Sequence, residues 1–259
     1  FGVCTAGHDM MQYGFMKSLQ LQVPLSLHTT FRLGGKAQYF VQVKSIDELA
    51  GAVKFAKEKM IPWFILGEGS NLLVSDDGFA GVVIKICTKG VEWNKLPDGS
   101  VEAVMSAGEH WDDVVAESVV RELYGFENLS GIPGTAGAAP VQNIGAYGSE
   151  IKDTLLWVEV FDTESMSIRT LGVSECKFAY RDSIFKGSEG KNFVVVRAAC
   201  KLNPQATTNI SYKDLGNFFA KEGKINPTLE EVRNAVLSIR KAKLPDVAVY
   251  GTAGSFFKN

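Results

Sequence analysis

Apolar positions in the first third of the chain recur with two different periods. Residues 37–43 alternate between apolar and polar side chains, which predicts a β-strand. Ser45 and Glu48 form a capping box, and helically spaced apolar residues follow it: Leu49, Ala52, Val53 and Ala56. The apolar run 62–66 predicts a second strand. The order strand, helix, strand predicts a parallel pair joined by a right-handed crossover.

The rest of the chain also mixes strand and helix patterns, which is typical of an α+β protein. Further strands are predicted at residues 72–75, 82–86, 101–107, 156–161, 168–171 and 193–198. A helix over 109–123 would bury one apolar face, made of Trp111, Val114, Val115, Val119 and Leu123. Thr228 and Glu231 cap a last helix, whose inward positions are Val232, Ala235, Val236 and Ile239.

The uncharged stretch 131–148 interrupts these periodic patterns. It holds five glycines and two prolines, and it also carries Ile, Val and Tyr, which a flexible linker would lack. Glycine lets a backbone approach a neighbour closely, and proline breaks helices and strand ladders. The stretch therefore predicts a buried, irregular wall, either against a flat ligand or within a tightly packed loop.

A second glycine-bearing segment, Gly67 to Asn71, directly follows the predicted strand 62–66. Two glycines at this place allow successive backbone N–H groups to point into one concavity, which suits a phosphate. The segment lacks the third glycine and the following helix of the dinucleotide-binding fingerprint. A pyrophosphate nest and a plain strand-to-strand turn both fit this pattern.

Composition and charge remove several classes of function. The chain has 259 residues and is 46% hydrophobic and 22% charged, which is an ordinary globular composition. Its formal net charge of −2 does not indicate binding to nucleic acid or to an anionic membrane. No long apolar run or signal peptide is present. Four distant cysteines without a C-x-x-C pair predict reduced thiols of a cytoplasmic protein: Cys4, Cys87, Cys176 and Cys200.

Two polar residues remain as candidates for a chemical role. The three histidines lack partners at ligand spacing, so a metal site is not expected, and no G-x-S-x-G motif makes a serine nucleophile. Arg181, set among aromatic residues, could pair with a carboxylate, and Ser255 could pass a proton to carbon. An ion pair of Arg181 with Asp182 and a turn role for Ser255 are the competing structural interpretations.

Four motifs, taken together, resemble one family. They are Gly67-Glu68-Gly69-Ser70-Asn71-Leu72, the segment from Ile132-Pro133-Gly134 to Gln142-Asn143-Ile144-Gly145-Ala146-Tyr147-Gly148, Tyr180-Arg181-Asp182-Ser183-Ile184-Phe185-Lys186, and Gly254-Ser255-Phe256-Phe257-Lys258-Asn259. From about Leu19 to Asn259 the chain resembles the UDP-N-acetylenolpyruvoylglucosamine reductase (MurB) family, flavoenzymes of bacterial peptidoglycan synthesis and cell wall biogenesis.

This resemblance implies a fold and a division of the chain. The fold would be a two-subdomain FAD-binding domain of the PCMH type, similar to vanillyl-alcohol oxidase, followed by the start of a substrate-binding domain. The implied parts are a leader of doubtful origin at 1–18, FAD-binding subdomains at 19–90 and 91–244, and the substrate-domain start at 245–259.

The resemblance also implies a reaction. NADPH would reduce FAD, and a hydride would then pass to the enolpyruvyl group of UDP-N-acetylglucosamine enolpyruvate. Arg181 would stabilise the enolate-like centre and Ser255 would supply its proton. Tyr180, Tyr212, Lys243 and Asn259 would bind substrate. The implied FAD contacts are Gly67, Glu68, Gly69, Ser70, Asn71, Ile132, Pro133, Gly134, Gly137, Ala138, Gln142, Asn143, Ile144 and Gly145.

The ends of the sequence raise a further expectation. The chain starts at Phe1, Met16 resembles a natural start, and the last residue comes four positions after Ser255. The glutamate that the family uses in its C-terminal domain is therefore absent, so we expect a fragment with impaired turnover, monomeric when full length. Exposure of Phe256 and Phe257 predicts disorder or self-association of the terminal segment.

Three other functions fit parts of the pattern. An FAD oxidase or dehydrogenase of the same fold would share the nest and the wall, and it would often tether its flavin covalently. A non-catalytic nucleotide-sugar binder would bind a UDP-sugar without flavin absorbance. A ligand-free α+β domain would show neither property.

Overall fold

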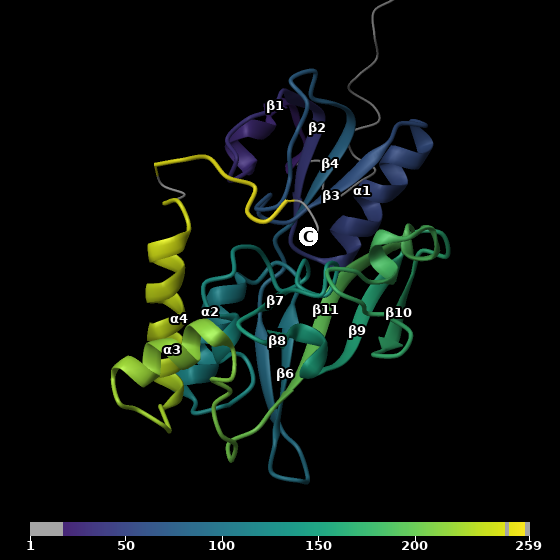
Figure 1. Ribbon diagram of the computed structural model, residues 1–259. Coiled ribbons are helices and arrows are strands. Elements are labelled where there is room, and N and C mark those ends of the chain that lie inside the picture. The colour runs from purple at the N-terminus through teal and green to yellow at the C-terminus, as the bar shows by residue number, and fades with distance from the viewer. Residues whose placement is uncertain (1–17, 247–248, 257–259) are drawn as a thin grey trace, which may run out of the picture.

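The computed structural model describes residues 18–246 and 249–256. Figure 1 shows one sheet with its helix α1 above a second, larger sheet, and a pair of helices at the side of the lower part. The four-stranded upper sheet lies within 19–90, and the five-stranded lower sheet lies within 91–244. The division into subdomains that we propose at residue 90 separates the two.

The upper sheet has the order β1-β2-β4-β3. Its elements are β1 (Gln20–Pro24), β2 (Lys36–Val43), α1 (Ile46–Glu58), β3 (Trp63–Leu66) and β4 (Phe79–Ile86). The predicted strand–helix–strand unit is present, and both β2 and β3 run parallel to β4. The predicted direct pairing of β2 with β3 is wrong, because β4 lies between them. Val82, Val83 and Ile84 in β4 are all buried, as a central strand requires.

Residues 72–75 do not form the predicted strand. The amide of Gly35 donates a 2.9 Å hydrogen bond to the carbonyl of Ser75, and Gly34 has φ +115° with its backbone pressed against Val74. This segment therefore packs across the Gly34–Gly35 turn instead of joining a ladder.

The lower sheet is wholly antiparallel, in the order β10-β9-β11-β6-β5. Its strands are β5 (Val91–Lys95), β6 (Val101–Ser106), β9 (Leu155–Asp162), β10 (Ser167–Gly172) and β11 (Phe193–Leu202). The helix α2 (Trp111–Val120) buries Trp111, Val114 and Val115 against this sheet, as predicted. It ends before Leu123, which is buried beyond the helix.

The helices α3 (Lys213–Lys221) and α4 (Leu229–Lys243) pack on one another around Leu215, Phe219, Val232 and Val236. The Thr228–Glu231 capping box is confirmed. Short elements complete the described chain: η3 (Leu25–His28), η4 (Glu127–Leu129), β7 (Gly145–Ala146), β8 (Ser149–Glu150), η5 (Ile151–Asp153), η6 (Ile184–Lys186) and η7 (Ser188–Gly190). Among the helices of residues 18–246 and 249–256, none has the length and apolarity needed to cross a bilayer.

Candidate active site

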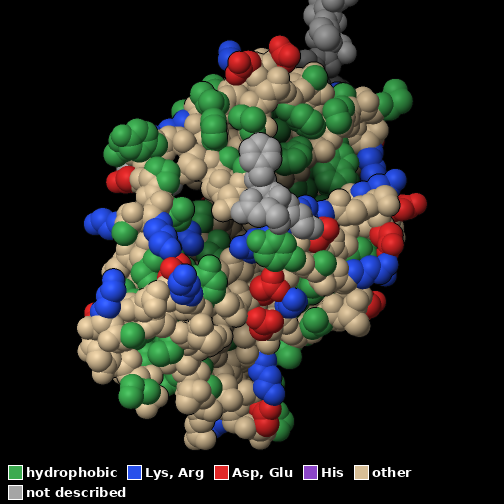
Figure 2. Space-filling view, viewed as in Figure 1, with side chains coloured by type: hydrophobic (Ala, Val, Ile, Leu, Met, Phe, Trp, Pro, Cys, Tyr) green, Lys and Arg blue, Asp and Glu red, His purple; other side chains and the backbone are tan. Residues whose placement is uncertain are grey.

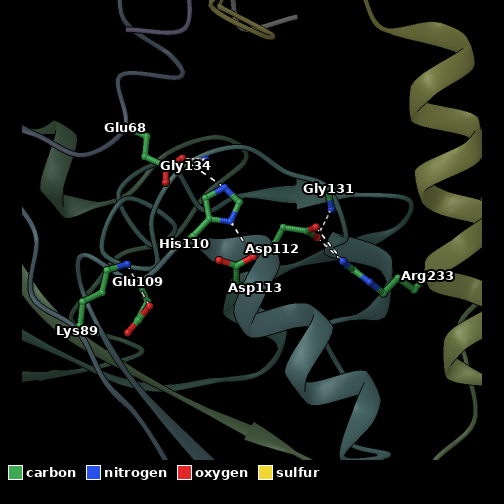
Figure 3. A network of polar contacts seen from close by, with 9 residues as sticks. All are labelled: Glu68, Lys89, Glu109, His110, Asp112, Asp113, Gly131, Gly134 and Arg233. Atoms are coloured by element: carbon green, nitrogen blue, oxygen red, sulfur yellow. Dashed lines mark hydrogen bonds and ion pairs between the residues drawn. The ribbon is translucent and has the colours of Figure 1, made fainter. Parts of the chain in front are cut away.

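The predicted nest and the predicted wall meet directly. The nest, residues 67–71, follows the end of β3 in the upper sheet, and the wall, residues 131–148, belongs to the lower part. The Glu68 carboxylate accepts a 3.2 Å hydrogen bond from the Gly134 amide, and Ser70 Oγ donates to the Pro133 carbonyl at 3.2 Å. Figure 3 shows Glu68, Gly134 and His110 together at this junction.

The wall is bound to the chain that joins β6 to α2. Gly134 O accepts from the Trp111 amide at 3.0 Å, and the Gly137 amide donates to Ala107 O at 2.9 Å. A Cβ on Gly137 would lie 2.4 Å from the Ala107 Cβ, so only glycine permits this approach. The predicted close packing of the wall thus has a specific partner.

A cavity of about 600 Å³ lies between the nest and the wall. Volumes of this size are typical of sites for cofactors and other small molecules. Its lining includes these predicted FAD contacts: Gly67, Glu68, Gly69, Ser70, Asn71, Ile132, Pro133, Gly134, Gly137, Ala138, Gln142 and Ile144. Sequence reasoning missed other lining groups, among them Trp63, Lys186, Lys191 and Phe193. The positions of Trp63 and Phe193 at strand ends were the available signal.

The nest has the properties that a phosphate requires. Gly69 adopts φ +65°, and a Cβ there would lie 2.3 Å from the carbonyl oxygen of His28. Within the described residues, the amides of Glu68, Gly69 and Ser70 donate no hydrogen bond to another protein group. Unpaired N–H groups on a glycine-bearing loop offer a ready anion site. These residues therefore fit a pyrophosphate.

Two predicted FAD contacts, Asn143 and Gly145, lie outside the cavity lining. Asn143 is fully buried; its Nδ2 donates to the Ala179 carbonyl at 3.0 Å, and its Oδ1 accepts from the Lys152 amide at 3.3 Å. The carbonyl of Gly145 accepts a hydrogen bond from Arg181 Nη2 at 2.5 Å. Both residues thus hold neighbouring protein segments in this structure.

Arg181 sits in a tight turn from Ala179 to Asp182, closed by reciprocal backbone hydrogen bonds of 3.0 and 3.1 Å. Its φ of +53° is left-handed, which is uncommon for a bulky residue. Its guanidinium lies 5.6 Å from the centroid of the Tyr180 ring, itself about half exposed. Arg181 does not line the cavity, but Phe185 and Lys186 from the same segment do.

The other predicted substrate residues gather at one end of the helix pair. Tyr212 is the N-cap of α3 and lies edge-on to Tyr147, with 5.6 Å between ring centroids. Lys243, at the end of α4, donates to Asp214 at 2.6 Å, which raises the pKa of the lysine. Burial lowers the pKa of nearby Arg240 and raises that of Tyr147. Figure 2 shows lysine and arginine side chains gathered over this end of α4.

Ser255 lies in a terminal segment that is docked on the nest. Asn71 Nδ2 donates to the carbonyls of Ala253 at 2.7 Å and Ser255 at 3.2 Å, and Thr30 Oγ1 donates to Thr252 O at 2.6 Å. Ala253 is buried. These hydrogen bonds hold the backbone of residues 249–256, and Phe256 is exposed as expected, so disorder or self-association of this segment stays a prediction. Asn259 lies outside the described residues, and Ser255 does not line the cavity.

Histidine and cysteine side chains offer no alternative centre in the described chain. His110 lies at the start of α2, 3.6 Å from both Glu68 and Asp113 (Figure 3). Cys87, Cys176 and Cys200 are free thiols. No group of three or more histidine, cysteine, aspartate and glutamate residues within 18–246 and 249–256 could hold a metal ion.

Comparison with known proteins identifies the class first. A family model described as an FAD binding domain matches residues 37–171, which include the nest, the wall and the strands between them. The chain is therefore an FAD-binding flavoprotein with an α+β fold. Among solved structures, a vanillyl-alcohol-oxidase-type flavoprotein from Myceliophthora thermophila shares this fold, with TM-score 0.51 and 17% identity over 66% of this chain and 32% of that one.

Closer relatives identify the family. UDP-N-acetylenolpyruvoylglucosamine reductase of Flavobacterium johnsoniae is 41% identical over 93% of this chain and 71% of its own length. The enzyme of Pseudomonas fluorescens is 38% identical, over 93% and 70%. The reductase structure from Thermus caldophilus matches 93% of this chain and 74% of its own, with 27% identity and TM-score 0.63. The chain belongs to the UDP-N-acetylenolpyruvoylglucosamine reductase family.

Proposed function

We propose that this protein contributes to peptidoglycan synthesis by reducing UDP-N-acetylglucosamine enolpyruvate to UDP-N-acetylmuramate with NADPH. The observation that carries the proposal is the cavity between the nest and the wall, inside a chain of this family. FAD, when bound, accepts a hydride from NADPH and delivers it to the methylene carbon of the enolpyruvyl group. The cytoplasm is the proposed location.

The chain's residues would hold FAD by two different means. The free amides at Glu68, Gly69 and Ser70 would receive the pyrophosphate. The uncharged wall, with Gly134, Ala138 and Gln142 at the cavity, would lie against the flat ring system. Ala138 is exposed to the cavity, so a larger side chain there would occupy ring space.

Arg181 and Ser255 would complete the reduction. Hydride addition to the methylene carbon leaves negative charge on the neighbouring carbon and its carboxylate, and a guanidinium stabilises such charge. The Ser255 hydroxyl would give its proton to that carbon, forming the new C–H bond, and would regain a proton from solvent. Hydrogen bonds from Asn71 of the nest to the backbone carbonyls of Ala253 and Ser255 support this role for Ser255.

Tyr212 and Lys243 would bind the nucleotide diphosphate end of the substrate, and Tyr180, beside Arg181, would also contact the substrate. Lys243 and Arg240 supply positive charge beside the Tyr147–Tyr212 pair. This end of the helix pair thereby suits a diphosphate, whereas the nest suits the cofactor.

The two half-reactions of the FAD-loaded chain test this proposal. We expect flavin absorbance bands in the purified protein, bleaching of these bands by NADPH, and their return in anaerobic solution on addition of UDP-N-acetylglucosamine enolpyruvate. The Arg181→Ala variant is expected to keep the bands and to slow their return by at least about 100-fold, the loss typical of a removed charge-stabilising group. A chain that binds UDP-sugar but no flavin would overturn the proposal.

A further inference from the structure

The segment that carries Arg181 is tied to the wall by side chains that do not reach the cavity. Asn143 Nδ2 donates to Ala179 O at 3.0 Å on one side of the Arg181 turn. Ser183 Oγ donates to Val141 O at 2.6 Å on the other side. Neither Asn143 nor Ser183 lines the cavity, and both are buried.

This turn needs such support because its backbone is strained. Arg181 holds φ +53°, a left-handed conformation that is unfavourable for a bulky non-glycine residue. Strain of this kind persists only where the surroundings over-determine the conformation. Asn143 also holds a left-handed φ, +45°, but asparagine tolerates this region well. The backbone of Asn143 is therefore not strained, whereas the backbone of Arg181, which Asn143 holds in place, is strained.

Both polar side-chain atoms of Asn143 make hydrogen bonds to the protein. Its amide donates to the Arg181 turn, and its oxygen accepts from the Lys152 amide at 3.3 Å, at the start of η5. With no solvent exposure of Asn143, a missing partner at either atom would leave a buried polar group unpaired, which is unfavourable. Asn143 therefore fixes the distance between the wall and the Ala179–Asp182 turn.

From this geometry we infer that Asn143 and Ser183 are positioning residues for Arg181, and that Asn143 acts through the turn and not by touching FAD. The inference rests on the proposed role of Arg181. Asn143 thus belongs to a part of the wall that does not line the cavity. Through the Ala179–Asp182 turn it sets the direction in which the Arg181 guanidinium points. With the turn held at this distance, Arg181 Nη2 donates to the Gly145 carbonyl at 2.5 Å.

Two conservative variants test the inference in the FAD-loaded chain. Asn143→Asp keeps the size, the left-handed tolerance and the acceptor for Lys152, but it removes the donor to Ala179. Ser183→Ala removes the donor to Val141, together with the acceptor of the Phe185 amide, with little change in volume. Matched controls are Asn203→Asp, an exposed asparagine whose Oδ1 accepts from the Gln205 amide, and Ser165→Ala, in the exposed β9–β10 turn.

Both variants should bind FAD within about threefold of the wild-type Kd and should be reduced by NADPH at the wild-type rate. Reoxidation by UDP-N-acetylglucosamine enolpyruvate should fall at least about tenfold in each, and the controls should match the wild type. Hydrogen exchange at the amides of Ala179 and Asp182 should quicken by at least about tenfold in Asn143→Asp, while exchange in β9 and β11 is unchanged. This exchange measurement does not depend on the reaction.

The outcomes separate the two proposals. If the wild-type flavin is not reoxidised by this substrate, the proposed function is wrong, and the exchange result still decides whether Asn143 holds the turn. If Asn143→Asp loses FAD while its turn amides keep wild-type exchange, Asn143 is a cofactor contact and the inference is overturned. If Asn143→Asp does not fold, Ser183→Ala decides: equal reoxidation in Ser183→Ala and wild type contradicts the inference.

Discussion

The buried thiols of Cys176 and Cys200 illustrate how strongly single positions of the lower core are shielded from solvent. Burial raises the pKa of Cys176 to about 11 and that of Cys200 to about 12. At pH 8 a thiol with the first value is ionised on the order of one part in a thousand, and the thiolate is the reactive form. Cys87, by contrast, is partly exposed.

We therefore predict selective labelling. In the native protein at pH 8, iodoacetamide should modify Cys87 and leave Cys176 and Cys200 unmodified, and all three should react after unfolding. Peptide mass spectrometry reads the sites, and Cys87→Ser should remove the native signal within the described residues. Modification of native Cys176 as fast as Cys87 would show that the core around Cys176 opens readily.

Also at the residue scale, the sequence predicted the composition of the site better than the role of each side chain. The glycines at 67, 69, 134 and 137 were predictable, because close approach and left-handed φ leave few alternatives to glycine. Asn143 was predicted as a flavin contact from its neighbours in the motif, yet its direction depends on Ala179, 36 residues away. No local pattern encodes which face of an irregular loop a side chain occupies.

Among the elements, α2 and α4 are joined by one ion pair that also holds the start of the wall. Asp112 accepts bonds of 2.7 and 2.8 Å from the Arg233 guanidinium and one of 2.5 Å from the Gly131 amide, as Figure 3 shows. Burial alone would raise the pKa of Asp112, but these donors hold it below its ordinary value. The pair connects the helix that bears Lys243 to the wall.

Removal of the Asp112–Arg233 ion pair should lower the stability of the fold. Because both side chains are largely buried, Arg233→Met should lower the free energy of unfolding by about 2–4 kcal/mol. The control Arg121→Met breaks the exposed pair with Glu117 and should cost less than about 0.5 kcal/mol. Urea unfolding measures both. A lowered folded-state pKa stabilises above the ordinary value of 3.8, so the difference between wild type and Arg233→Met should persist at pH 7 and shrink below about pH 4.

Secondary structure was predictable where a periodic pattern was long, and less so where tertiary pairing decided. The helix α1 and the hairpin of β9 and β10 follow their local patterns. The insertion of β4 between β2 and β3 depends on which strands pair, and β5 was missed because most of its side chains are polar. The helix α3 did leave a signal, since Leu215, Phe218 and Phe219 have the spacing i, i+3, i+4.

For the whole molecule, the position of the cavity couples cofactor binding to stability. Its nest side follows β3 of the upper sheet, and its wall side is bonded to the β6–α2 connection of the lower part. A ligand held by both contacts favours only the folded arrangement of the two. Free FAD at 100 times its Kd should therefore raise the free energy of unfolding by about 2.7 kcal/mol.

A matched pair of glycine variants tests this coupling. Gly69 and Gly99 both have positive φ, which alone should cost alanine about 1–2 kcal/mol of stability without FAD, and the steric clash at Gly69 adds to this cost. At Gly99 the added Cβ meets nothing within 4 Å, whereas at Gly69 it would lie 2.3 Å from the His28 carbonyl and displace the nest. Thermal unfolding with and without FAD should then show the wild-type increase in Tm for Gly99→Ala and little or none for Gly69→Ala. An undiminished increase in Gly69→Ala would mean that FAD is held without the nest, and that the wall alone carries the cofactor.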